Sequence, residues 1–297
     1  MAHVLNNEKL LSLDDLFKST GNGLEDASAS QVVEIQLNEL HEFKGHPFKV
    51  LDDAQMDMLV ESIKDIGVSQ PGIARKLKTG GYEIIEGHRR HRACELAGLD
   101  SMPFKVVDWN DDTATAYMTL SNLTQRKEFL ISEKALAYRQ LRDVLEHQGK
   151  KGMLTAARIS EGFGDSESTV KRLIRLSYLI TPLLDLIDMK RLGLDQGKNI
   201  SYLTEEHQKL VYAAIEETKA SVSMEQARKI RECADSGSLT EERIKEILSP
   251  EKKSKKRSFT MKEDILDGYF SSDYTNEEIR EVIISLLEDW KAVHDLG

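Results

Sequence analysis

The sequence is poor in the residues that mark secreted, membrane and disulfide-stabilised proteins. Its two cysteines, Cys94 and Cys233, are far apart and fit no disulfide or metal spacing. No apolar run approaches the roughly 20 residues that a membrane span requires, and the N-terminus lacks a basic-then-apolar signal pattern. We therefore expect a cytoplasmic protein that does not enter a membrane.

An excess of positive charge, which is usual in nucleic-acid-binding proteins, is also missing, because the formal net charge is −10. The charge is segregated, however. Lys150 to Arg175 contains six Lys and Arg residues against three Asp and Glu, and Glu251 to Lys262 contains six against one. The average charge therefore does not exclude a nucleic-acid partner.

The length of 297 residues suits two or three domains. Strand-like and helix-like segments alternate at first, whereas almost everything after residue 127 has helical periodicity. The predicted fold class is α+β, with a small α/β domain followed by helical domains. The predicted boundaries are a mobile leader at 1–29, the α/β domain at 30–127, a helical domain at 128–235, a basic linker at 236–260 and a helical tail at 261–297.

The pattern also predicts individual elements. Strands are expected at VVEIQL, GIARKL, YEIIE and MPFKVV. One helix in the α/β domain is expected to bury Met56, Leu59, Ile63 and Ile66, and another Ala93, Leu96 and Ala97. Later helices are expected to start at Ser132, Ser166, Thr181, Thr204, Ser223 and Thr240.

The stretch EGHRRHRACELAGL at residues 86–99 places Arg89, Arg90 and Arg92 at the start of a predicted helix. A helix N-terminus is already positive, so each exposed cation there costs roughly a few tenths of a kcal/mol unless an anion binds. Gly87 lets an oxyanion approach the backbone, and Arg89 and Arg92 share one face of the helix. The segment predicts a polyphosphate site; the alternative is a solvated basic helix that pairs with acidic neighbours.

This stretch resembles the GERRxRA signature of the ParB partition-protein family. LVESIKDIGVSQPGIARK resembles the family segment before the signature, and SNLTQRKEFLISEKALAY resembles its third motif, usually written ENxQR. The resemblance runs from about residue 32 to residue 235 and is nearest to the branch on plasmids and conjugative elements of Gram-positive bacteria. Family members fold this domain around CTP with magnesium and close as a clamp on DNA.

The resemblance implies a set of site residues. The triphosphate would be held at the arginine signature, the metal would be placed with help from Asn122, and the loop before the hairpin would line the pocket. The implied nucleotide-binding residues are Gln70, Pro71, Gly72, Gly87, His88, Arg89, Arg90, Arg92 and Asn122.

Three departures from the family pattern bear on catalysis. The QPR element is shortened to His46-Pro47-Phe48-Lys49, the signature glutamate is His88, and the glutamate of the third motif is Ser121. Thr124 also looks like an insertion in that motif. A neutral imidazole replaces a carboxylate on magnesium poorly, and His88 beside three arginines should resist becoming positive. We expect slow or absent CTP hydrolysis with CTP-dependent closure preserved.

Residues 155–176, TAARISEGFGDSESTVKRLIRL, have the outline of a helix-turn-helix, although any helical hairpin can imitate this pattern. The family has its helix-turn-helix at this place. Ser166 would cap the second helix, with Val170, Leu173 and Ile174 facing inward. The outward and N-terminal residues of that helix are the predicted contacts with double-stranded DNA: Ser168, Thr169, Lys171, Arg172 and Arg175.

Three segments outside these domains were assigned by pattern. KKSKKR at 252–257 is either a solvated linker or a sequence-independent contact with DNA phosphates. The tail after the capping box Thr275–Glu278 predicts a homodimer seam, formed by Ile279, Val282, Ile283, Leu286, Leu287 and Trp290. Relatives use a basic leader, often with an Arg, to stimulate a ParA-like ATPase, and this leader contains only Lys9 and Lys18.

Three functions compete at this level. The first is a partition protein that acts as a CTP-gated DNA clamp. The second is a related transcriptional regulator without a clamp. The third is an enzyme on the α/β domain, such as a nuclease, a small-molecule kinase or a sulfiredoxin-like reductase; the last needs a cysteine where Gly87 stands, and Cys94 is expected to be buried.

Overall fold

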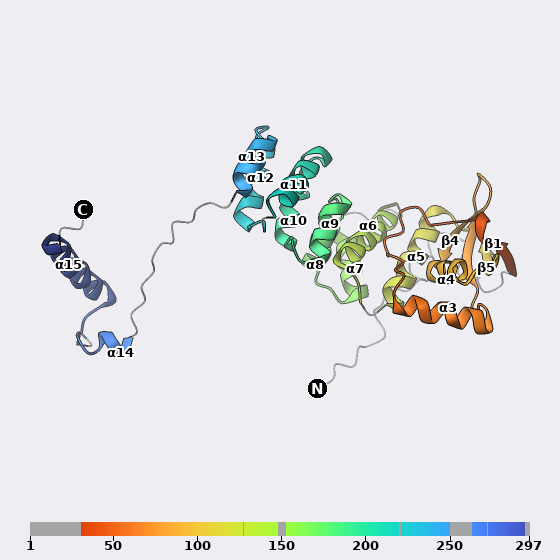
Figure 1. Cartoon of the computed structure of the whole chain (residues 1–297), viewed down its shortest axis with the longest axis horizontal. Coiled ribbons are helices and arrows are strands. Elements are labelled where there is room, and N and C mark those ends of the chain that lie inside the picture. The colour runs from red at the N-terminus through yellow and green to blue at the C-terminus, as the bar shows by residue number, and fades with distance from the viewer. Residues whose placement is uncertain are drawn as a thin grey trace. The chain divides into compact units, whose positions relative to one another are not determined.

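The computed structural model describes residues 31–126, 128–147, 153–219, 221–249, 263–271 and 273–294. The predicted leader and the KKSKKR segment lie outside these residues. The chain divides into one unit that ends at Ser249 and a second that starts at Pro250 (Figure 1). In the described part of the chain, no helix is long and apolar enough to cross a membrane.

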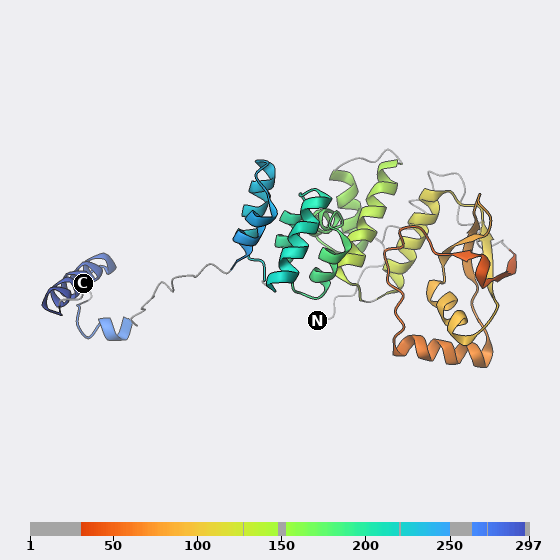
Figure 2. The same ribbon diagram turned by 45° about the horizontal axis from the view of Figure 1, so that its top comes forward.

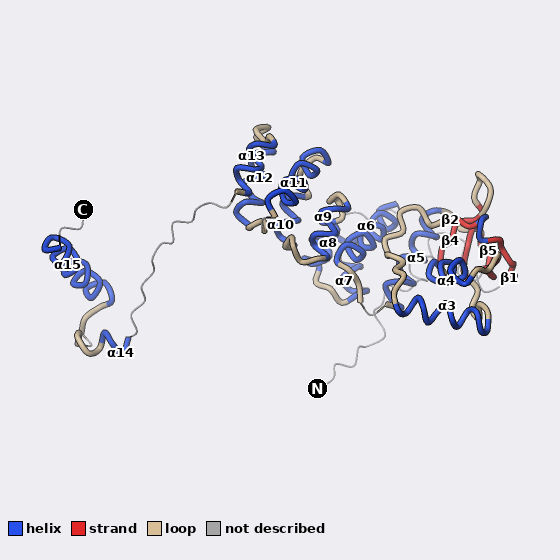
Figure 3. Tube along the Cα trace, in the orientation of Figure 1, coloured by secondary structure: helices blue, strands red, loops and turns tan. Residues whose placement is uncertain are grey.

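The first unit starts with a mixed sheet of five strands in the order β1-β5-β3-β4-β2. The strands are β1 (Val32–Gln36), β2 (Leu40–His41), β3 (Gly72–Lys76), β4 (Tyr82–Glu86) and β5 (Ser101–Val107). β5 pairs antiparallel with β1 and parallel with β3, and β3 and β4 form the predicted hairpin. Figure 3 shows these strands gathered at one end of the unit, so the predicted α/β beginning is confirmed.

Two helical layers use opposite faces of this sheet, because neighbouring strand residues point to opposite sides. Ala74 and Ile84 pack under α3 (Ala54–Ile66) and α4 (His88–Ala97), which lie side by side (Figure 2). Ile73 and Ile85 pack on the other side with α5 (Asp111–Gln125). The arginine stretch therefore begins a helix that follows directly from β4.

The second face of the sheet continues into a helical core. α6 (Ile131–His147), α7 (Met153–Phe163) and α8 (Glu167–Leu176) pack on one another. They are followed by α9 (Thr181–Asp188), α10 (Leu194–Ile200), α11 (Glu205–Thr218), α12 (Met224–Asp235) and α13 (Glu241–Leu248). One hydrophobic core joins this helical part to α5, and Lys49 bonds Asp185 at 2.7 Å across the same junction.

The second unit contains α14 (Glu263–Leu266) and α15 (Asn276–His294). The capping box at Thr275 is confirmed, because its hydroxyl accepts from the N–H of Glu278, whose carboxylate accepts from Thr275. None of the α15 side chains is buried. Leu286, Leu287 and Trp290 are all more than half exposed, and Ile279 and Ile283 are half-buried, so within the described chain the predicted seam is only partly covered.

Several inward-facing predictions are wrong. Ile66 is 74% exposed and Leu96 is 44% exposed, whereas Val60 and Cys94 fill the core positions instead. Ile66 is the last residue of α3, whereas Ile63, one turn earlier, is buried. Ser132 is not a helix cap: α6 begins one residue earlier, and the hydroxyl of Ser132 donates to Asp188.

Candidate functional site

A cavity of about 290 Å³ opens where β4, α4 and α5 meet. We call it the arginine-turn pocket. Its lining comes from the loop after β2, from the β4–α4 junction and from the end of α5. The lining residues are His46, Val50, Glu86, Gly87, His88, Arg89, Arg90, Ser121, Asn122, Gln125 and Arg126.

The backbone at Gly87 makes the N-terminus of α4 accessible. Gly87 is the N-cap with φ of 110°, a left-handed conformation that favours glycine, and no side chain caps the helix there. A Cβ at Gly87 would come within 3.3 Å of the Cα of Gly72. The first N–H groups of α4 therefore have no side-chain partner at the cap and lie at the pocket, as anion binding requires.

The arginines of α4 do not all face this pocket. Arg89 lines it and bonds Asp53 at 3.1 Å, whereas Arg92 points to Asp52 at 2.7 Å and to Glu95 and is absent from the lining. Hydrogen bonds from these arginines lower the pKa of Asp52 and of Asp53, the N-cap of α3. The alternative prediction, a basic helix that pairs with acidic neighbours, is therefore right about the neighbours of Arg89 and Arg92. These ion pairs do not remove the pocket, which Arg89 still lines.

Arg90 holds the loop before β3. Its guanidinium donates to the carbonyls of Gln70 and Pro71, at 2.5 and 2.7 Å, and lies 3.5 Å from Glu86. Burial lowers the pKa of Arg90. Gln70, Pro71 and Gly72 are therefore next to the site through Arg90, and none of the three lines the cavity.

His88 is packed against His46, with ring centroids 3.9 Å apart. Burial lowers the pKa of His88 to about 3, with smaller effects from His46 and His91, and burial also lowers the pKa of His46. The expected neutrality of His88 is confirmed, but its main cause is burial and not the arginines. The shortened QPR element thus contributes an uncharged ring to the pocket.

The end of α5 supplies the remaining wall. Asn122 donates its amide to the carbonyl of Met118 at 2.8 Å, which leaves its side-chain oxygen as an acceptor. Sequence reasoning missed Gln125 and Arg126, although their spacing of three and four residues from Asn122 places them on the same helix face. Arg126 is fixed between Glu133 and the ring of Phe48.

The donors of this pocket fit magnesium. Mg²⁺ prefers oxygen ligands and is usually bound by one or two carboxylates together with substrate phosphates. Glu86 and Asn122 supply a carboxylate and an amide oxygen at the cavity wall. Among the described residues, this pocket included, no group of three or more His, Cys, Asp or Glu residues is arranged to hold a metal, so the phosphates of the nucleotide would have to supply the remaining ligands.

The environment of Cys94 does not support the sulfiredoxin-like interpretation. Cys94 is fully buried, and burial raises the pKa of its thiol, so this sulfur is not a reactive thiolate. The expectation that Cys94 faces inward is confirmed.

The helix-turn-helix outline is confirmed as a structure. α7 and α8 are joined by a turn in which Gly164 has φ of 74°, and Ser166 caps α8 by accepting from the N–H of Thr169. Val170, Leu173 and Ile174 are buried as predicted. Ser168 and Lys171 are exposed on the outer side of α8.

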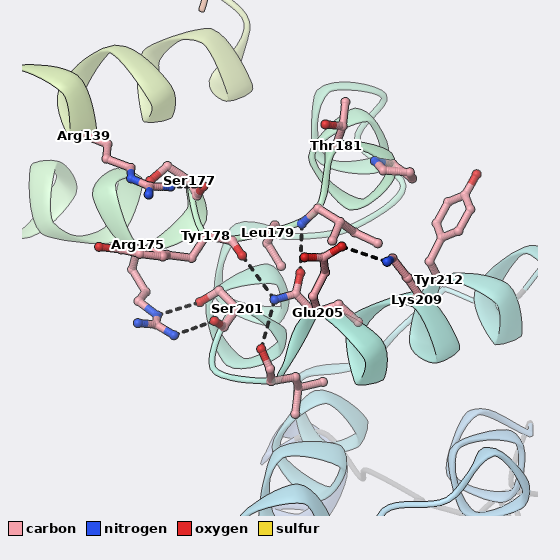
Figure 4. A pocket seen from close by; sticks show the side chains of 14 residues that line it. Arg139, Arg175, Ser177, Tyr178, Leu179, Thr181, Ser201, Glu205, Lys209 and Tyr212 are labelled. Carbon is pink, nitrogen blue, oxygen red and sulfur yellow. Dashed lines mark hydrogen bonds and ion pairs between the residues drawn. The ribbon is translucent and has the colours of Figure 1, made fainter. Parts of the chain in front are cut away.

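The two arginines of α8 are less free than predicted. Arg172 is half-buried and lies 3.6 Å from the carboxylate of Asp195, although its Nε has no hydrogen-bond partner. Arg175 is half-buried: it donates to the hydroxyl of Ser201 at 2.9 Å and to the carbonyl of Ser201 (Figure 4). Its guanidinium also lies 3.8 Å from the ring centroid of Tyr202. The ring centroid of Tyr178 lies 5.0 Å from the same guanidinium. Arg175 is therefore partly exposed and partly tied to Ser201, and its contact with DNA stays a prediction.

Around α8 the structure forms a basic groove of about 480 Å³. Five of its lining residues are cations, and two tyrosines separate them. The lining is Arg142, Ser168, Lys171, Arg172, Ile174, Arg175, Tyr178, Lys198 and Tyr202. Sequence reasoning missed Arg142 and Lys198, because they come from α6 and α10 and not from the helix-turn-helix. Such a groove suits a phosphate backbone.

Two family models match the chain. The ParB N-terminal domain matches residues 22–123, and the ParB HTH domain matches residues 127–232. The first match contains most of the arginine-turn pocket, and the second contains the helix-turn-helix. Together they cover both candidate sites except Gln125 and Arg126, which lie between the two matches.

Curated relatives agree with these matches. A nucleoid occlusion protein of Halalkalibacterium halodurans is 27% identical over 236 residues, which are 79% of this chain and 75% of that protein. A probable chromosome-partitioning protein ParB of Vibrio cholerae is 30% identical over 182 residues, or 61% of this chain and 59% of that protein. The matches thus span between 59% and 75% of these relatives' lengths.

A solved structure is also similar in sequence. The C-terminally truncated chromosome-partitioning protein ParB from Caulobacter crescentus, complexed with CTP-gamma-S, is 25% identical, with 59% of this chain and 94% of that chain covered and a TM-score of 0.31.

Proposed function

Because the chain belongs to the ParB partition-protein family, we propose that it is a DNA-binding partition protein whose α/β domain binds CTP with magnesium and closes as a dimeric clamp on DNA. The observation that carries the proposal is the arginine-turn pocket, where the N-terminus of α4, Arg89 and Asn122 meet at one cavity. The helix-turn-helix with its basic groove, in the same unit, is the proposed reader of a specific site.

The residues of the pocket suit the binding of a triphosphate. The N–H groups at the start of α4 can donate to oxyanions. Arg89 pairs with the carboxylate of Asp53 at 3.1 Å, and it can exchange this partner for a phosphate. Bound magnesium neutralises phosphate charge, and Asn122 offers it an oxygen ligand. His88 is half-buried and its pKa is lowered to about 3, so at neutral pH it adds no charge and no strong base. We therefore propose that binding and closure are retained while hydrolysis is slow.

The two arginines of α4 provide a matched test. Arg89→Ala and Arg92→Ala remove the same charge from the same helix, but only Arg89 lines the pocket. Loss of a charge-assisted hydrogen bond costs about 1.5–3 kcal/mol, so Arg89→Ala should weaken CTP binding by roughly 10- to 100-fold. Arg92→Ala should change it less than about threefold, since it lies outside the cavity.

Isothermal titration of the full chain with CTP, ATP, GTP and UTP in magnesium measures this directly. No preference for CTP, or equal losses in both variants, would contradict the proposed nucleotide site. The regulator alternative is tested separately by sequencing DNA recovered with the protein, because a clamp spreads beyond its site and a plain regulator does not. We also propose a ParA-like ATPase as a partner of this chain.

A further inference from the structure

Glu86 is the one carboxylate among the residues that line the arginine-turn pocket. It is the last residue of β4 and directly precedes Gly87, so its position is fixed by the sheet on one side and by α4 on the other. Its side chain is 24% exposed, so the carboxylate is partly shielded from solvent at the cavity wall.

Two hydrogen bonds orient this carboxylate. The hydroxyl of Tyr117 donates to Oε2 at 3.1 Å, and Arg90 approaches Oε1 at 3.5 Å. Burial, followed by the effect of Glu86, raises the pKa of Tyr117, so the phenol keeps its proton and remains a donor. Each oxygen has lone pairs beyond those that these two donors use.

The other candidates for a cation ligand in this pocket are weaker. His88 and His46 are stacked against each other, and imidazole is a poor ligand for magnesium. The hydroxyl of Ser121 donates to the carbonyl of Met118. Asn122 has a free amide oxygen but no charge. A divalent cation brought in by a triphosphate would find one anionic protein ligand in the cavity.

We propose that Glu86 is the carboxylate that binds the divalent cation accompanying the triphosphate, with the side-chain oxygen of Asn122 as the neutral ligand beside it. Tyr117 is then a positioning residue, since it holds Oε2 of Glu86 in place. This inference rests on the proposed function, because it needs a nucleotide to bring the cation. Glu86 would thereby provide the negatively charged metal ligand that His88 and Ser121 cannot provide.

Glu86→Gln tests the charge without removing the side chain. Glutamine can still accept a hydrogen bond from Arg90 or Tyr117, so the fold should stay intact, and a thermal melt checks this. Without metal, in EDTA, the variant should bind CTP as well as the unchanged protein or better, because a negative charge near the phosphates is gone. The ratio of the CTP affinity in magnesium to the CTP affinity in EDTA should be at least tenfold smaller for Glu86→Gln than for the unchanged protein.

The two opposite effects distinguish a lost metal ligand from general damage, which would weaken binding in both conditions. Glu95→Gln is the matched control, because Glu95 lies on α4 and pairs with Arg92 outside the pocket; its magnesium dependence should not change. Mn²⁺ in place of Mg²⁺ gives a spectroscopic measurement, and the signal of protein-bound Mn²⁺ with CTP should be weakened or altered only in Glu86→Gln.

Two results would overturn the inference in different ways. Normal CTP binding by the unchanged protein, with the same magnesium dependence in Glu86→Gln, would remove Glu86 from the metal site and leave the proposed function standing. Absence of CTP binding by the unchanged protein, with or without metal, would overturn the nucleotide site and the role of Glu86 together.

Discussion

Replacement of Arg175 tests whether this residue holds α8 in position or contacts DNA directly. In the structure Arg175 joins α8 to the end of α10 through Ser201, which is buried, and it lies between Tyr178 and Tyr202. Arg175→Gln removes the charged hydrogen bonds and the cation–π contacts. Arg175→Lys keeps the charge but loses the planar fork that makes both contacts.

The structural cost can be worked out from these contacts. Hydrogen bonds of a charged group contribute about 1.5–3 kcal/mol when a buried partner is left unsatisfied. Cation–π contacts add roughly 0.5–1 kcal/mol at partly exposed rings. We expect both variants to lose about 2–4 kcal/mol of unfolding free energy, which for a unit of this size lowers Tm by roughly 5–15 °C.

The assay combines a thermal melt with the salt dependence of DNA affinity. A residue that neutralises one phosphate contributes about 0.9 to the slope of log K against log salt concentration. Lys171→Gln is the control, because the side chain of Lys171 is 51% exposed: its slope should fall by about 0.9 and its Tm should not change. Arg175→Gln should instead lower Tm and leave the slope unchanged. A reduced slope with unchanged Tm in Arg175→Gln, restored by Arg175→Lys, would refute this reasoning.

Three further predictions follow from the charges and the uncovered tail. Because the pKa of His88 is about 3 in the fold and near 6.5 when unfolded, stability is complete above pH 6.5 and falls by about 1–2 kcal/mol between pH 7 and pH 5; urea titrations at both pH values measure this, and a flat profile contradicts it. Asp53→Asn keeps an N-cap but releases Arg89, so CTP affinity should rise; a fall would mean that Asp53 assists binding. Glu at Ile283 and Leu287 should yield monomers by light scattering while the first unit keeps its Tm; a persistent dimer places the seam elsewhere.

The local parts of the fold were predictable because they depend on neighbours in sequence. Strand alternation, the Ser166 and Thr204 caps and the capping box at Ser223 are set within a few residues. Periodicity also identifies one face of a helix, but it cannot say which neighbour covers that face. Ile66 illustrates the limit, because it continues the apolar spacing of Ile63 yet is 74% exposed, whereas Ile63 is 4% exposed.

The site was predictable only in outline for a similar reason. The spacing of Arg89 and Arg92 suggested a shared grip, but Arg92 is drawn outward by Asp52, which lies 40 residues earlier. The contacts of Arg175 could not be predicted for the same reason, because its partner Ser201 lies at the end of another helix. Glu86 was visible in the sequence beside Gly87, but its contact with Tyr117 depends on how α5 crosses the end of β4.

The strand order has a consequence for how a ribosome-bound chain matures. β1 is hydrogen-bonded to β5 alone, and its last residue, Gln36, pairs with Ser101, which is made 65 residues later. At about 5–20 residues per second, β1 waits roughly 3–13 s for its partner. During that interval Val32, Val33 and Ile35 belong to an unpaired apolar strand, a form prone to wrong pairing. Nascent chains stalled before Ser101 should therefore be the species that aggregate or recruit chaperones, and chains that have passed Val107 should not.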